Sequence, residues 1–197
     1  MPHDTNIAEL IGSRICHDLI SPIGAINNGL ELIEMRIPSG GPEMALISHS
    51  ASNASARIRF FRIAFGATGS QLVGRQEVAS ILKDVYSDTR LTVNWGPVDG
   101  LPRNIVRMTF LALLCLETGM PYGGRIEIEQ DGEQIVLCGH ADKLKIDTTL
   151  WDMIKGDPRE EKLHAAQVQF CLLPQIAADE LHTITTAIKE TCITIRI

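Results

Sequence analysis

The stretch Arg14-Ile-Cys-His-Asp-Leu-Ile-Ser-Pro-Ile-Gly-Ala-Ile-Asn-Asn-Gly29 decides how this 197-residue chain is interpreted. It places a histidine, followed at once by an aspartate, inside a run whose aliphatic residues recur at steps of three and four. This spacing is typical of a helix that is buried along one side. The sequence therefore predicts a long amphipathic helix that ends at about Arg36, with an apolar stripe made of Ile7, Ile11, Ile15, Leu19, Ile23, Ile26, Leu30, Ile33 and Ile37.

The helix has candidate capping residues at its start and a proline near its middle. Asp4, Thr5 or Asn6 can cap it, and Glu9 follows Asn6 at the spacing of a capping box. Pro22 removes one backbone hydrogen bond and can either end the helix or kink it. Because the apolar stripe continues unbroken beyond the proline, we expect a kinked but continuous helix.

His17 lies about 200° from both Ile15 and Leu19 on this helix, so it points away from the apolar stripe. A single histidine on a helix is most often a solvated residue or one at the rim of the core. Here, however, the inward face is complete without it, and Asp18 is close enough to orient or deprotonate an imidazole nitrogen. These features favour a nucleophilic histidine. Cys16 lies about 100° around the helix from His17, and we do not expect a catalytic Cys–His pair.

The face around His17 is small and partly apolar, which would let another protein approach closely. Its members within about 60° of the histidine are Leu10, Ser13, Arg14, Ile20, Ser21, Gly24 and Asn28.

A second helix is expected from about Pro42 to Phe65, after a tight turn over 38–42. Two long helices joined by a short turn form an antiparallel hairpin, and a hairpin with a broad apolar stripe normally pairs with a second one. We therefore expect a homodimer through residues 4–65, in which two hairpins form a four-helix bundle. His49 has polar neighbours and is interpreted as a surface residue. The second helix has a heptad seam composed of Ile47, Ala51, Ala54, Ile58, Phe61 and Phe65.

A glycine-containing linker at 66–74 separates two expected domains, a hairpin over 1–66 and a second domain over 75–197. The second domain alternates helices and strands, which suggests a two-layer α/β sandwich with a mixed sheet and helices on one face. The whole chain is thus of the α+β class. We expect helices at 76–88, 102–118, 148–155 and within 158–178, and strands at 90–97, 125–130, 134–139, 181–188 and 192–197.

Composition narrows the function classes. The formal net charge of −6 argues against nucleic acid as a partner. No apolar run is long enough to span a membrane, and no secretory signal opens the chain, so we expect a cytoplasmic protein without a membrane partner. The five cysteines are scattered and do not form a metal or disulfide pattern.

These motifs resemble a known family. A His-Asp helical hairpin followed by an α/β sandwich is similar to the dimerisation and ATP-binding domains of sensor histidine kinases. The stretch from Arg14 to Leu32 is closer still to the alphaproteobacterial ChpT family of histidine phosphotransferases, as are the segments 120–128 and 168–174. The resemblance covers nearly the whole chain.

The chain departs from the kinases where they bind ATP. A kinase of this fold has an asparagine in the helix before the Gly-Gly-Arg-Ile strand, whereas the segment 111–118 contains none. No glycine pair follows Asp142, and no glycine-rich lid is found at 160–169. His140 and Asp142 are therefore interpreted as surface residues, and Gly123-Gly124 as a turn. The resemblance then implies a degenerate ATP-binding domain.

The resemblance implies a phosphorelay protein that carries a phosphoryl group on His17 between the aspartates of receiver domains, without binding ATP. Its partners would be the receivers of a hybrid histidine kinase and of response regulators. No cofactor or metal of its own is expected, because the receiver would supply Mg²⁺. Asp18 would act on the ring, Arg14 would offset phosphoryl charge, and the other residues of the His17 face would stabilise or dock. The alternatives are a dimeric adaptor without catalysis and an ATP-dependent autokinase.

Overall fold

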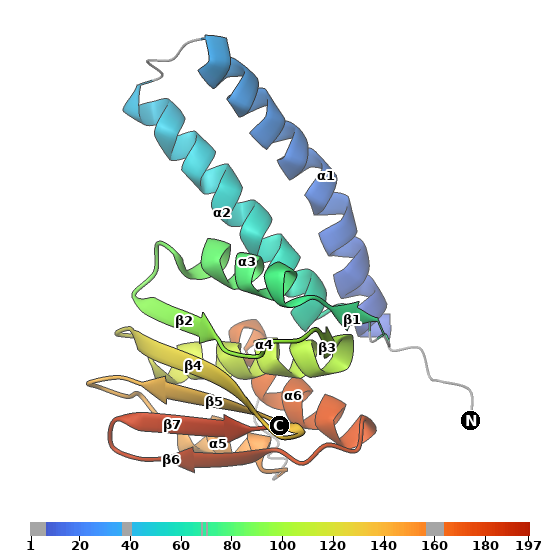
Figure 1. The fold of residues 1–197 in the computed structure, drawn as a ribbon, viewed down its shortest axis with the longest axis vertical. Coiled ribbons are helices and arrows are strands. Elements are labelled where there is room, and N and C mark those ends of the chain that lie inside the picture. The colour runs from blue at the N-terminus through green and yellow to red at the C-terminus, as the bar shows by residue number, and fades with distance from the viewer. Residues whose placement is uncertain (1–6, 37–40, 68, 70, 157–163) are drawn as a thin grey trace. The chain divides into compact units, whose positions relative to one another are not determined.

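A computed structural model describes residues 7–36, 41–67, 69, 71–156 and 164–197 (Figure 1). Contacts between Cα atoms divide the chain into two compact units, residues 1–67 and 68–197. None of the helices within the described ranges is long and apolar enough to cross a membrane.

The first unit contains two long helices, α1 (Ile7–Arg36) and α2 (Pro42–Ala64), which pack against each other. The predicted helical hairpin is confirmed, and α1 continues through Pro22 without a break. Pro42 begins α2, where its missing N–H and fixed φ fit the first turn. The capping residues 4–6 and most of the predicted turn at 38–42 lie outside the described residues.

The predicted seam of α2 is only part of its apolar surface. Ala51 on the seam is buried, but Ile47 remains 51% exposed. A second set lies about 160° around the helix and was missed, because a heptad template finds a single stripe. This set is almost fully buried and comprises Ala56, Phe60, Ile63 and Ala64.

The second unit is built on a five-stranded mixed sheet in the order β2-β4-β5-β7-β6. The parallel pair is β2 (Leu91–Trp95) and β4 (Gly124–Asp131), and the other neighbours are antiparallel. The remaining strands are β5 (Gln134–His140), β6 (Thr185–Ile188) and β7 (Cys192–Arg196).

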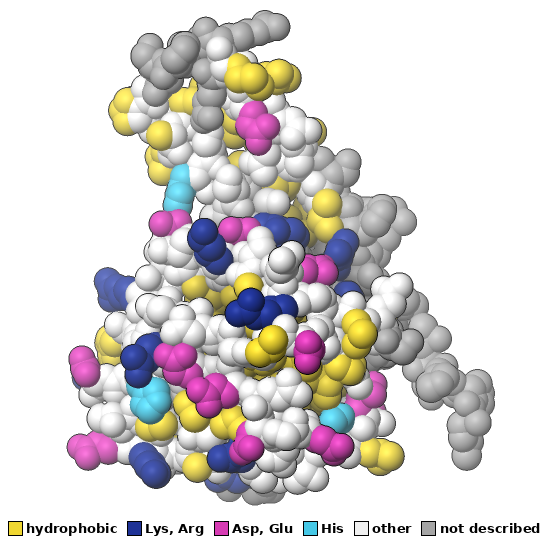
Figure 2. Space-filling model, viewed as in Figure 1, with side chains coloured by type: hydrophobic (Ala, Val, Ile, Leu, Met, Phe, Trp, Pro, Cys, Tyr) yellow, Lys and Arg dark blue, Asp and Glu magenta, His cyan; other side chains and the backbone are white. Residues whose placement is uncertain are grey.

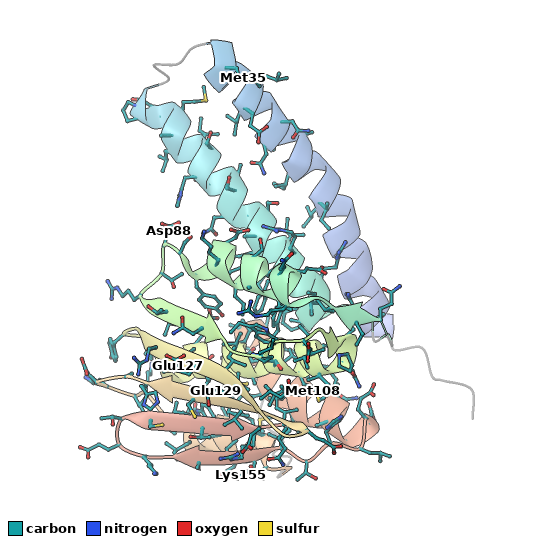
Figure 3. The ribbon with its side chains drawn as sticks, viewed as in Figure 1. Met35, Asp88, Met108, Glu127, Glu129 and Lys155 are labelled. Carbon is teal, nitrogen blue, oxygen red and sulfur yellow. The ribbon has the colours of Figure 1, made fainter. Side chains whose placement is uncertain are left out.

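Four α-helices complete this unit: α3 (Arg75–Tyr86), α4 (Arg103–Gly119), α5 (Thr148–Ile154) and α6 (Gln169–Asp179), the last preceded by the 3₁₀ turn η1 (Ala165–Gln167). Figure 1 shows α4, α5 and α6 on one side of the sheet. Ile126 and Ile128 of β4 are buried, whereas Glu127 and Glu129 occupy the alternate positions on the open face (Figure 3). The predicted two-layer sandwich is confirmed.

Two short strands were not predicted: one lies within the linker predicted at 66–74, and the other ends at residue 102, just before α4 begins at Arg103. β1 (Leu72–Val73) pairs with β3 (Leu101–Pro102) as a separate two-stranded sheet, and Val73 and Leu101 are buried. Two residues are too few for alternation to be recognised in the sequence.

The strand predicted at 181–188 begins later than expected, at Thr185. The residues before it close the end of α6: the N–H of Leu181 donates to the Ala178 carbonyl and that of His182 donates to the Ala177 carbonyl. This is the Schellman arrangement, and Leu181 occupies its left-handed position with φ 60°.

Candidate functional site

The predicted site lies on α1, whose backbone is described throughout. The side chains of His17 and Asp18 lie outside the described residues, as do those of four members of the surrounding face: Leu10, Ser13, Arg14 and Ser21. The other three members are described. Ile20 and Gly24 are half-buried, and Asn28 is exposed.

Helix periodicity relates position 17 to the described residues around it. Gly24 and Asn28 lie within about 20° of that position. A β-carbon added to Gly24 would meet no atom within 4 Å, and Asn28 is exposed, so this face is open at both places.

The face of α1 that packs against α2 is marked by Gly12 and Leu30. A β-carbon at Gly12 would lie 3.1 Å from the Phe65 carbonyl oxygen at the end of α2, and Leu30 is 9% exposed. These two positions coincide around the helix and lie about 140° from position 17. Position 17 therefore does not lie on the packed face of α1.

Part of the apolar stripe remains uncovered in the single chain. Leu19, Ile26 and Ile33 are 45%, 47% and 40% exposed, although they lie on the side opposite position 17. At the far end of the hairpin, Met35 of α1 (labelled in Figure 3) and Leu46 of α2 are exposed as well. These five exposed residues give the hairpin an apolar surface.

The segment 111–118 of α4, where a kinase of this fold has its asparagine, packs mostly into the core. Within the segment 111–118 of α4, the fully buried residues are Leu111, Ala112, Leu113, Cys115 and Leu116. Burial raises the pKa of the Cys115 thiol well above its ordinary value, so this sulfur stays protonated.

The helix α6 packs against α4, and α5 packs against α6. The amide nitrogen Nε2 of Gln169, at the start of α6, lies 3.2 Å from Thr118 Oγ1 and 3.5 Å from the Leu114 carbonyl oxygen. Trp151 of α5 is buried and stacks edge-on against Phe170 at 5.6 Å between ring centroids.

The glycine pair before β4 has a structural role. Gly123 and Gly124 adopt φ values of 101° and 145°, and a β-carbon on Gly124 would lie on the His140 carbonyl oxygen. His140 and Asp142 are exposed, as predicted, although His140 ends β5 and does not lie in a loop. His49 is exposed too. Among the side chains described, no group of three or more His, Cys, Asp or Glu is arranged to hold a metal ion.

Comparison with known proteins places both units in context. Residues 75–191 match the family model for the C-terminal domain of histidine phosphotransferases. The chain is 36% identical over 174 residues to the protein phosphotransferase ChpT of Brucella abortus (strain 2308), covering 83% of this chain and 81% of that relative. A solved structure of a bacterial phosphotransferase is 32% identical, with a TM-score of 0.72, over 100% of this chain and 97% of that one.

Proposed function

Because this chain belongs to the histidine phosphotransferase family and is a phosphotransferase of the ChpT type, we propose that it passes phosphoryl groups between receiver-domain aspartates through a phosphohistidine at His17. The family was predicted from the sequence motifs, and the comparisons confirm it. The observation that carries the proposed site is the open face of α1 at Gly24 and Asn28, which shares its direction with position 17.

The proposed transfer needs only His17, Asp18 and the aspartyl phosphate of the receiver. An unprotonated imidazole nitrogen of His17 attacks the phosphorus of an aspartyl phosphate. The N–P bond forms, the P–O bond to the aspartate breaks, and the receiver's carboxylate leaves. The proton on the other ring nitrogen is held or accepted by Asp18, which fixes the tautomer. The reverse steps deliver the phosphoryl group to a second receiver.

The remaining residues of the face would serve positioning and charge. Phosphoryl transfer depends mainly on alignment and on neutralising charge. Arg14 lies one turn before His17 and would offset the phosphoryl charge, while Ser21 and Asn28 would donate hydrogen bonds. Small or aliphatic residues would let the receiver approach closely: Leu10, Ser13, Ile20 and Gly24. The receiver would bring the Mg²⁺ ion.

We also propose that the second unit does not bind ATP. The support is the packing of α4: five of the eight residues in its segment 111–118 are fully buried, and Gln169 Nε2 donates to the Leu114 carbonyl at 3.5 Å.

Dimerisation would complete the hairpin. The uncovered side chains of Leu19, Ile26 and Ile33 lie on one side of α1, opposite position 17, so a second hairpin could cover them and leave His17 accessible. Replacing Ile26 by Asp should convert a dimer into a monomer in light-scattering measurements. Asn28→Asp is the matched control on the opposite side and should leave the mass unchanged. If the wild-type chain had the mass of a monomer both at high concentration and after 100-fold dilution, the proposed dimer would be contradicted.

Labelling with phosphate tests the transfer itself. The protein is incubated with radiolabelled ATP alone, and then with a receiver domain phosphorylated by its own kinase. Acid-labile label should appear only with the phosphorylated receiver, and His17→Ala should abolish it. His49→Ala removes an exposed histidine from the same unit and should keep full labelling. Asp18→Ala should slow transfer by roughly 100-fold or more, as loss of acid–base assistance does.

Each other outcome identifies a different function. Labelling by ATP alone would indicate an autokinase. Stable receiver binding that survives His17→Ala, with no label on the wild-type chain, would indicate an adaptor without catalysis. Label that persists in His17→Ala would place the carrier residue elsewhere.

A further inference from the structure

One edge strand of the five-stranded sheet, β2, has backbone hydrogen-bonding groups that no other described strand pairs. Among the described residues, β2 has β4 as its one neighbour in the sheet. The Gly124 N–H donates to the Arg90 carbonyl at 3.0 Å, and the Gly96 N–H donates to the Ile128 carbonyl at 2.7 Å. Parallel ladders alternate, so the even-numbered residues of β2 direct their backbone groups toward β4 and the odd-numbered ones direct theirs outward.

Of the three outward residues, two have free backbone groups within the described part of the chain. The N–H and carbonyl of Leu91 both bond to the Thr89 hydroxyl, at 3.2 and 3.1 Å. Val93 and Trp95 have no comparable local partner. Their N–H and carbonyl groups form a short template on which another strand could pair.

A groove runs along this edge between β2 and α3, with a volume of about 340 Å³. Its α3 side is formed by Ala79, Leu82, Lys83 and Tyr86, and its strand side by residues 91–95. Figure 1 shows α3 beside β2. A helix lying next to an open strand edge is the arrangement that binds extended peptides by strand addition, with pockets for alternate side chains.

The indole of Trp95 is a spectroscopic reporter beside the groove. Its indole nitrogen Nε1 is buried and has no hydrogen-bond partner among the described residues. Trp95 lines the groove. An indole N–H can only donate, and a buried donor without an acceptor is costly. Because Nε1 has almost no exposed surface, a peptide in the groove would alter the surroundings of the indole without bonding to this N–H.

Charge indicates the chemistry of the occupant. Lys83 is the one lining residue that carries a charge at neutral pH, and it is exposed. The groove therefore has a local positive charge on a chain whose net charge is −6, so a carboxylate on the peptide would be attracted to it. Figure 2 shows that acidic and basic side chains are otherwise intermingled over the visible face of this unit.

We propose that the groove between α3 and β2 binds an extended segment of a partner protein, which pairs with Val93 and Trp95 as an added strand. The segment presents aliphatic side chains at alternate positions to the groove and a carboxylate to Lys83. Only five residues of β2 are available before Gly96 and Pro97, so the paired segment is short. The proposal is independent of phosphoryl transfer at His17, and its test uses binding alone.

The probe is a phage-displayed library of random eight-residue peptides, selected on the full-length protein. Enriched peptides should alternate aliphatic and other residues and contain an Asp, a Glu or a free C-terminus. Synthetic versions should slow amide hydrogen exchange at Val93 and Trp95 at least 10-fold while leaving Thr92 and Asn94 unchanged. They should also shift the NMR signal of the Trp95 indole N–H, which is one of only two indole signals in the protein.

Two variants test the backbone pairing and the charge interaction separately. Val93→Pro removes one outward N–H, which the β2–β4 ladder does not use, so the fold is retained and binding falls at least 10-fold. Lys83→Glu reverses the groove charge and should weaken binding several-fold, whereas Lys189→Glu, an exposed lysine after β6 near the other edge of the sheet, should not change it. An unshifted Trp151 indole signal verifies that each variant is folded.

Three results would overturn the proposal: a selection that enriches no peptide, peptides that bind Val93→Pro or Lys83→Glu as tightly as the wild type, and equal protection of odd- and even-numbered amides. Without peptide, the amides of Val93 and Trp95 could instead become more protected from hydrogen exchange as the protein concentration rises. That result would identify the occupant of the groove as a second copy of this chain and not a partner protein.

Discussion

Gly12 of α1 lies directly against the backbone of Phe65, the residue that caps α2, so that a β-carbon would lie 3.1 Å from the Phe65 carbonyl oxygen. This contact holds the first turns of α1 against the end of α2, on the side of α1 turned about 140° from position 17. Close approach of two helices therefore depends on a glycine at this position.

Replacing Gly12 by Leu should destabilise the protein. Overpacking typically costs about 1–3 kcal/mol, and the better helix propensity of leucine offsets up to about 1 kcal/mol. The matched control is Gly24→Ala, where the added methyl group meets no atom within 4 Å and helix propensity should raise the free energy of unfolding by up to about 1 kcal/mol. Urea unfolding of both variants measures the change in the free energy of unfolding. Equal stability of the two variants would show that Gly12 does not face α2 closely.

Gln169 should be a stability residue of the second unit. Its buried Nε2 donates toward the Ala166 and Leu114 carbonyls and the Thr118 hydroxyl at 3.1–3.5 Å. Gln169→Ala should lower the free energy of unfolding by about 1–3 kcal/mol, because buried acceptors lose their donor. Gln130→Ala removes an exposed amide bonded to the Gly132 carbonyl and should change it by less than about 0.5 kcal/mol.

A near-isosteric variant separates hydrogen bonding from packing. Gln169→Glu keeps the size of the side chain but replaces the donor by a second acceptor facing two carbonyls. It should be at least as destabilising as Gln169→Ala at pH 7. If Gln169→Glu were as stable as the wild type, the donor would have no role in joining α6 to α4.

Leu181 should be replaceable with a gain in stability. It occupies the left-handed position of the Schellman motif after α6, with φ 60°, and its side chain is 94% exposed. For a residue with a β-carbon this conformation costs roughly 1–2 kcal/mol, which glycine avoids. Leu181→Gly should therefore raise the free energy of unfolding by about 1 kcal/mol in urea unfolding. Leu181→Ala keeps the strain while removing the exposed apolar group, so a gain equal to that of glycine would exclude the strain as the cause.

Leu181 also illustrates what sequence patterns can and cannot predict here. The hairpin of α1 and α2 and the strands β4 and β5 follow from periodicity and turn signals, because each is specified by residues close in the sequence. A leucine after α6 gives no signal of a helix cap, since glycine is usual there. The strands β1 and β3 are stabilised by pairing across 28 positions, between Val73 and Leu101, which no local window contains.

The two candidate sites differ in the same way. The direction of position 17 follows from the stripe of α1 alone, so it could be predicted, whereas the family resemblance was needed to assign a phosphoryl carrier. The groove beside β2 could not be predicted. It depends on β2 being an edge strand, which is decided by its long-range pairing with β4, and on the packing of α3 next to it.

Cys115 should make stability fall at alkaline pH. Burial raises the pKa of its thiol well above 9.0 in the folded protein, while the unfolded chain ionises near that value. Below pH 9.0 the thiol is protonated in both states and its contribution to stability is complete. Above it, only the unfolded state loses the proton, so the free energy of unfolding falls by about 1.4 kcal/mol per pH unit from this group.

The variant Cys115→Ala tests this dependence. It leaves a small cavity and lowers the free energy of unfolding by a constant amount, but it lacks the slope with pH. Urea unfolding at pH 8 and pH 10 should therefore show the gap between wild type and Cys115→Ala narrowing by about 1.4 kcal/mol. Cys171→Ala, at an exposed cysteine, should run parallel to the wild type. A constant gap for Cys115→Ala over the same range would mean that the folded thiol ionises like that of the unfolded chain, and that α4 is open to solvent.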